Sequence, residues 1–99
     1  MQHISLRRQT ESGEVLAELE GGLDPKVIEW VPPSSICLRF IDPYGDTIFN
    51  QLQIPVLVSE LVELQKTVSE QELKSHIELV VLFLRASEEV HVYVCFVGD

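Results

Sequence analysis

The sequence predicts a two-layer α+β domain, in which two long helices cover one face of a mainly antiparallel, five-stranded sheet. Segments near both ends alternate polar and apolar residues with the period of a strand. By contrast, residues 56–97 contain neither glycine nor proline, and their apolar residues follow the helical period as far as residue 84. The resulting order, strand-strand-short helix-strand-strand-helix-helix-strand, is typical of a single α+β domain, here residues 1–99.

The first two strands are expected to form a hairpin. Polar and apolar residues alternate across residues 3–10 and again across residues 15–20. The intervening Glu11-Ser12-Gly13 is typical of a tight turn, because Gly13 can take a positive φ. Gly21-Gly22 then ends the second strand.

A short helical turn is predicted next. Asp24-Pro25 is a helix-start signal, since Asp24 can cap the helix and Pro25 lacks only an N–H that would have no partner there. Pro32-Pro33 limits this short helix to at most two turns. We expect this turn to lay Trp30 over one end of the core, with a place at the edge of a ligand pocket as the alternative.

The second predicted hairpin spans residues 35–53. Its strands are expected at Ser35–Ile41 and Thr47–Gln53, because both segments are rich in apolar residues at alternate positions. Asp42 and Pro43 suit the first two positions of a type I turn. Gly45 is expected to take the left-handed conformation that closes a three-residue hairpin loop.

Two helices and a final strand complete the chain. The helical period runs over residues 57–68, and Ser69-Glu70-Gln71-Glu72 has the form of a capping box that starts a second helix. Residues 77–84 are apolar enough to form a buried strand instead, but the helix is preferred. Residues 91–97 alternate again and are expected to run antiparallel to the fourth strand.

More apolar surface is predicted than two layers can bury. The second helix carries a further stripe, and the second face of the sheet is not cleanly polar. The stripe comprises Leu79, Leu82, Phe83 and Ala86, and the sheet residues are Cys37, Ile41, Phe49, Tyr93, Cys95 and Val97. Because extensive exposed apolar area marks a contact surface, we expect self-association, most simply as a two-fold homodimer.

Composition narrows the classes of partner. Sixteen acidic and seven basic residues give a formal charge of −9, spread evenly along the chain. This charge argues against nucleic acid and favours either a basic protein partner or simple solubility. The longest apolar run, Leu79–Leu84, is too short to span a membrane, and the N-terminus lacks the apolar region of an export signal. We therefore expect a cytoplasmic protein of bacterial type with no membrane partner.

The two cysteines are expected to be buried, reduced thiols. Cys37 and Cys95 lie in apolar runs of a chain without a recognisable secretory leader. Zinc held by these cysteines with His91 or His3, and a catalytic pair of Cys37 with His91, are the alternatives. The sequence contains no calcium-loop, phosphate-loop or nucleophile-elbow motif, so no metal or cofactor is predicted.

Candidate binding residues gather around the second hairpin. Asp42, Pro43 and Gly45 are explained by the turn itself, whereas neighbouring polar and aromatic residues have no evident structural task. Arg39 stands out as the one charge in an apolar segment, and a covered arginine needs a carboxylate partner such as Asp46 or Glu18. The candidates are Arg39, Tyr44, Asp46, Asn50, His91 and Tyr93.

Three classes of function follow. The leading hypothesis is a small, acidic, non-catalytic protein-interaction module, comparable in size and charge to inhibitors, immunity-type proteins or adaptors. The alternative is a small-ligand-binding or sensory accessory domain with a pocket between Trp30 and Tyr93. An enzyme is the third, and its predicted site is Arg39, Asp42, Asp46 and His91.

Overall fold

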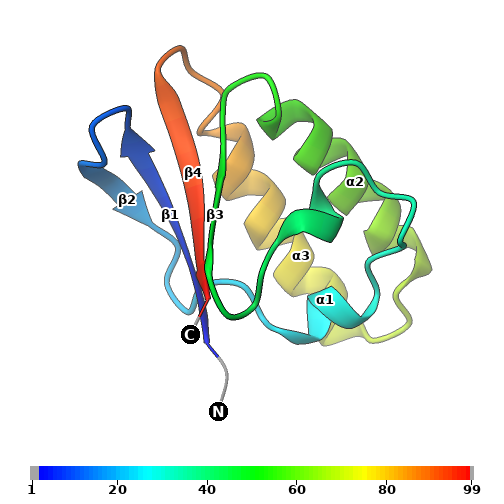
Figure 1. Cartoon of the computed structure of the whole chain (residues 1–99). Helices are drawn as coiled ribbons and strands as arrows, with labels where there is room; N and C mark the ends of the chain where they lie inside the picture. Colours follow the sequence, from blue (N-terminus) through cyan, green and yellow to red (C-terminus); the bar gives the residue numbers. More distant parts are fainter. Residues whose placement is uncertain (1–2, 99) are drawn as a thin grey trace.

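A four-stranded antiparallel sheet and a layer of helices make up the fold (Figure 1). The structure is a computed structural model that describes residues 3–98. Its strands are β1 (Ile4–Thr10), β2 (Val15–Glu18), β3 (Asp46–Phe49) and β4 (Val92–Gly98). Its helices are α1 (Lys26–Glu29), the 3-10 helix η1 (Leu38–Phe40), α2 (Ile54–Thr67) and α3 (Gln71–Arg85). The α+β class is confirmed, but the sheet has four strands and not five.

The sheet order is β2-β1-β4-β3, which places the two longest strands in the middle. β1 and β4 pair along their full length, from Ile4 opposite Gly98 to Thr10 opposite Val92. The predicted antiparallel pairing of the last strand with the strand before the helices is confirmed, since β4 pairs with β3. The predicted N-terminal hairpin is confirmed as well, with Gly13 at a φ of 89° in its turn.

The segment predicted as the third strand, residues 35–41, forms no strand. The carboxylate of Glu60, on α2, accepts hydrogen bonds from the backbone N–H groups of Ile36, Cys37 (3.0 Å) and Leu38 (3.0 Å). Three successive N–H groups that converge on one carboxylate cannot alternate between two sides of a strand, as a sheet ladder requires. The chain therefore curls into η1, and Ser35 Oγ accepts a further bond from the N–H of Arg39 at 2.9 Å.

The turn at residues 42–45 forms, but it does not close a hairpin. The N–H of Gly45 donates to the carbonyl of Asp42 at 3.3 Å, and the N–H of Tyr44 donates to Asp42 Oδ1 at 2.8 Å. Gly45 is not among the glycines with positive φ in the described chain, so the predicted left-handed conformation is wrong. The strand that follows ends at Phe49 because Asn50 Oδ1 accepts the N–H groups of Leu52 and Gln53 and turns the chain into α2.

Both long helices are confirmed, and residues 77–84 are helical. The residue at the N-terminal cap position of α3 is Glu70 rather than the predicted Ser69. The helices pack on the face of the sheet that carries the apolar side chains of β1 and β4, and Phe49 meets Phe96 edge to face at 5.9 Å. The fully buried core includes Ile4, Leu6, Val27, Ile54, Leu57, Leu61, Ile77, Val80, Leu84, Val94 and Phe96.

The surplus apolar surface is distributed differently from the prediction. Leu79 and Leu82 of the second helical stripe are 56% and 53% exposed, whereas Phe83 is half-buried beneath the guanidinium of Arg8, 4.8 Å from the ring centre. Phe49, predicted on the second sheet face, belongs to the core. Cys37 and Ile41 are also buried in the core, outside the sheet. Among residues 3–98, no helix combines the length and apolarity that a membrane crossing needs.

Candidate functional site: the open face of the sheet

The sheet has one face that no other part of residues 3–98 covers, because α1, α2 and α3 all lie on the opposite side (Figure 1). Side chains alternate along a strand, so the residues between the core positions of β1 and β4 point to this face. The strand register extends the same face to β2 and β3. We call it the open sheet face, and its residues are Ser5, Arg7, Gln9, Glu18, Asp46, Ile48, Tyr93, Cys95 and Val97.

The register sets these side chains in rows. One row crosses all four strands, because Arg7 of β1 lies opposite both Glu18 of β2 and Cys95 of β4, and Cys95 in turn lies opposite Ile48 of β3. Directly opposite residues have Cβ atoms about 4.5–5.5 Å apart, so each row is a line of touching neighbours. Of the predicted site residues, Asp46 and Tyr93 belong to this surface.

The middle of the open sheet face is apolar. Cys95 is only 2% exposed although no helix covers it, and Tyr93 and Val97 beside it are half-buried. Ile48 is 54% exposed. Antiparallel sheets that face water on one side normally place polar residues there, so an apolar centre indicates a contact surface.

Arg7 gives this surface its main electrostatic feature. Its Nε atom is buried and has no hydrogen-bond partner among the described residues. Burial raises the pKa of the Cys95 thiol, the charge of Asp46 raises it further, and Arg7 opposes both. Both cysteines are free and buried, as predicted, and Cys95 is held as a neutral thiol.

Three predicted residues meet at one end of the sheet. Asn50, His91 and Tyr93 line a hollow of about 280 Å³ together with Glu11 and Gln51. His91 Nδ1 lies 2.6 Å from Glu11 Oε1, and the N–H of His91 donates to Gln51 Oε1 at 3.1 Å. His91 has a φ of 67°, which is uncommon for a residue with a side chain. The oxygen of Asn50 is occupied by the turn before α2, so its role here is structural.

The structure separates the other predicted residues from this group. Arg39 lies in η1, where its guanidinium stacks on Phe40 at 4.6 Å and its charge acts on Glu60. It is exposed and therefore needs no buried carboxylate partner such as Asp46. Tyr44 is exposed in the turn before β3. The predicted enzyme site combined His91 with Arg39, Asp42 and Asp46. None of the last three lines the hollow at His91, so the four residues do not form one site there.

A second hollow, of about 380 Å³, lies between α2 and the loop that precedes η1. Its lining includes Trp30, but Tyr93 lines the separate hollow at His91, so the predicted pocket between these two aromatic residues does not form. We call it the Trp30 hollow, and its residues include Trp30, Pro32, Ser34, Ser59, Glu60 and Glu63.

Glu60 is the residue that sequence reasoning missed. No motif in the sequence singles it out, yet its carboxylate holds the loop before η1. Burial alone would raise the pKa of Glu60, but the three backbone N–H donors and the charge of Arg39 outweigh burial and lower it. Its partners are backbone groups, which every residue carries, so the sequence contains no signal for this contact.

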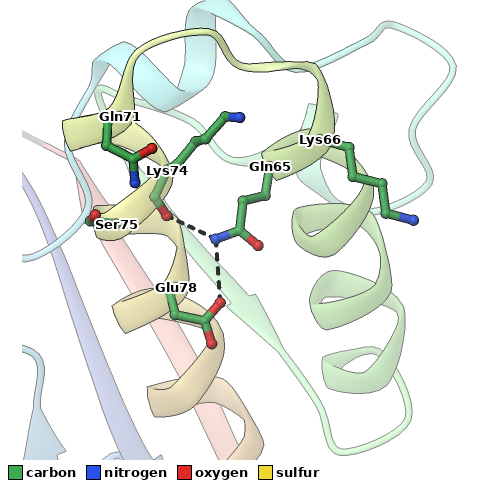
Figure 2. A pocket seen from close by; sticks show the side chains of 6 residues that line it. All are labelled: Gln65, Lys66, Gln71, Lys74, Ser75 and Glu78. Carbon is green, nitrogen blue, oxygen red and sulfur yellow. Dashed lines mark hydrogen bonds between the residues drawn. The ribbon is translucent and has the colours of Figure 1, made fainter.

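Two further hollows are lined by charged or polar groups. Figure 2 shows one between α2 and α3, where Gln65 Nε2 donates to the carbonyl of Lys74 at 2.9 Å and to Glu78 Oε2 at 3.3 Å. In the other, His76 Nε2 accepts the N–H of Asp24 at 2.9 Å. Burial lowers the pKa of His76, and the charge of Asp24 opposes that effect. His76 is therefore a neutral acceptor that secures the loop before α1.

Neither a metal centre nor a relative supplies a further clue to function. Within residues 3–98, no three His, Cys, Asp or Glu side chains are placed to hold a metal ion. Comparison with protein-family models, curated proteins and solved structures found no match. The functional inference therefore depends on the surfaces of this chain.

Proposed function

We propose that this protein is a non-catalytic protein-interaction module that self-associates through the open sheet face. The observation that supports the proposal most directly is the apolar patch that Tyr93, Val97 and Ile48 form around the buried Cys95 on the face of the sheet opposite the helices. The alternative of a small-ligand domain is less well supported, because Trp30 and Tyr93 line different hollows.

The dimensions of the face suit a modest dimer. β1 and β4 have seven residues each, which corresponds to a length of about 23 Å, and four strands span about 19 Å including their own width. The area of such a patch lies at the lower end of the range for specific interfaces, where each partner buries roughly 600 Å². We therefore expect a dissociation constant of roughly micromolar order, since weak and transient associations populate the low end of interface size.

The charges of the face favour a second copy as the partner. Arg7 has an unpaired Nε, and Asp46 lies two strands away on β3. In a two-fold dimer each contact occurs twice. An axis along β4 would lay β1 of each copy against β3 of its partner, so that the guanidinium of Arg7 approaches a carboxylate in both halves of the interface.

Sedimentation equilibrium with protein at 1–300 μM, as an order-of-magnitude range around the expected constant, tests the proposal. The wild-type protein should form dimers, and Ile48→Asp should be monomeric because it places a charge in the apolar centre. Leu52→Asp is the matched control, since Leu52 is 77% exposed and lies outside the open sheet face.

Two results would overturn the proposal. The first is a wild-type protein that stays monomeric across the concentration range. The second is an equal loss of dimer in Ile48→Asp and Leu52→Asp, which would place the contact elsewhere or attribute it to general apolarity. Circular dichroism of each variant establishes that the fold is intact.

A further inference from the structure

The Trp30 hollow is separate from the open sheet face. It lies in the helical layer, between α2 and the loop of residues 30–38, whereas the open sheet face is on the other side of the sheet. Trp30 is 37% exposed at its edge and is the only tryptophan of the chain. A partly exposed indole that lines a hollow can contact a ligand there.

The wall of the hollow is held in place by contacts within the fold. Glu60 accepts the N–H groups of Cys37 and Leu38 at 3.0 Å each, and Ser35 Oγ accepts that of Arg39 at 2.9 Å. The Glu60 bonds tie the loop to one residue of α2, and the Ser35 bond closes a turn within the loop itself. A site whose wall is already ordered loses less conformational entropy when a ligand binds.

The charge of the hollow is negative. Glu60 and Glu63 both line it. Lys66 pairs with Glu63 at 3.0 Å, but both side chains are about two-thirds exposed, so water screens the pair and a ligand can displace it at little cost. The guanidinium of Arg39 stacks on Phe40, and Arg39 is not among the lining residues.

We propose that the Trp30 hollow binds a basic side chain, lysine or arginine, of a partner protein. A cation over the face of an indole is attracted by the ring quadrupole, and tryptophan is the strongest of the aromatic residues in this respect. Glu63 supplies the opposite charge, and the hydroxyls of Ser34 and Ser59 supply further acceptors. The net charge of −9 attracts a basic partner from a distance. This inference goes beyond self-association, because it concerns another surface and a different partner.

The hollow in Figure 2 does not fit the same ligand. Lys66 and Lys74 both line it, so a basic side chain would meet like charges there. Among the described residues that line the Trp30 hollow there is no lysine, although Lys66 pairs with the lining residue Glu63. Because the two hollows differ in the charge of their lining residues, a basic side chain fits the Trp30 hollow and not the hollow in Figure 2.

Fluorescence of the sole tryptophan provides a direct test. The probe is the peptide acetyl-Gly-Arg-Gly-amide, and the control peptide contains citrulline, an uncharged isostere of arginine. The titrations use the Ile48→Asp protein as well as the wild type. A fluorescence change that occurs only in the wild type would come from self-association, so the result for the Trp30 hollow does not depend on whether the protein dimerises. We expect a saturable change with the arginine peptide alone.

Matched charge variants locate the binding. Glu63→Gln should weaken the arginine peptide roughly two- to fivefold, the effect of losing one exposed charge contact. Glu72→Gln makes the same change of net charge at an exposed position of α3 outside the hollow, and should leave the affinity unchanged. Equal weakening by the two variants, an equal response to citrulline, or no saturable change with arginine would each overturn the proposal.

Discussion

Replacement of Glu60 by glutamine tests how the loop before η1 is held. The carboxylate accepts three backbone N–H groups, from Ile36, Cys37 and Leu38. Glutamine presents a single acceptor oxygen, so at least one N–H loses its partner, and the remaining bonds lose their ionic character. A hydrogen bond to a charged group contributes about 1.5–3 kcal/mol to stability, but this site is partly exposed. We therefore expect Glu60→Gln to lower the free energy of unfolding by about 2–4 kcal/mol.

The pH dependence of the same variant gives a second measurement. The folded protein lowers the pKa of Glu60 below its ordinary value of 4.5. The unfolded chain therefore binds the proton more readily, and the stabilisation is present above pH 4.5 and lost as the pH falls through the folded pKa. The difference in stability between wild type and Glu60→Gln should accordingly be largest near neutral pH and shrink below pH 4.5.

Urea unfolding, followed by far-ultraviolet circular dichroism, measures both effects. Glu63→Gln is the control, because Glu63 is exposed one turn further along α2 and its side chain pairs only with Lys66 in the described chain. Similar unfolding curves for the two variants would refute the anchoring role of Glu60. So would a stability difference between wild type and Glu60→Gln that does not shrink in acid.

Two further predictions concern close contacts elsewhere in the fold. A Cβ atom on Gly98 would lie 2.4 Å from the backbone carbonyl carbon of Pro43. Gly98→Ala should therefore lower the free energy of unfolding, measured in urea, by about 1–3 kcal/mol. An unchanged unfolding midpoint would contradict the tight approach of the turn to β4. The neutral His76 accepts the N–H of Asp24, and its pKa is lowered from 6.5, so its contribution is present above pH 6.5 and lost as the pH falls through the folded pKa. Relative to His76→Gln, the wild-type protein should lose stability between pH 7.5 and 5, measured by thermal unfolding at a series of about six pH values; parallel pH profiles would contradict this.

Residues 35–41, predicted as a strand, show which structural choice the sequence alone does not determine. Residues 35–41 alternate in the manner of a strand, yet Ile36 and Phe40 are exposed while the adjacent Cys37 and Leu38 are both buried. The pattern of apolar residues is compatible with either outcome. Glu60, more than twenty residues further along the chain, decides between them by binding the N–H groups that a neighbouring strand would otherwise have used.

The candidate site was only partly accessible to prediction for the same reason. Tyr93 and Asp46 point to the open sheet face, as strand periodicity allows one to expect for Tyr93. Arg7, by contrast, lies in a segment that the sequence predicts only as a strand of the first hairpin, and its unpaired Nε is evident only when β4 lies beside β1. Arg39 is a candidate from the sequence because it is the one charge in a predicted strand. That reason no longer applies, since the residue lies in η1 and not in a strand.

The sequence by itself determined the elements whose residues interact mainly with near neighbours. The N-terminal hairpin, both long helices and the final strand follow from periodicity and turn chemistry. Only the tertiary structure decided the sheet order, the row from Glu18 through Arg7 and Cys95 to Ile48, and the Trp30 hollow. These features arise from backbone hydrogen bonds between segments far apart in the chain, and backbone groups are the same at every residue.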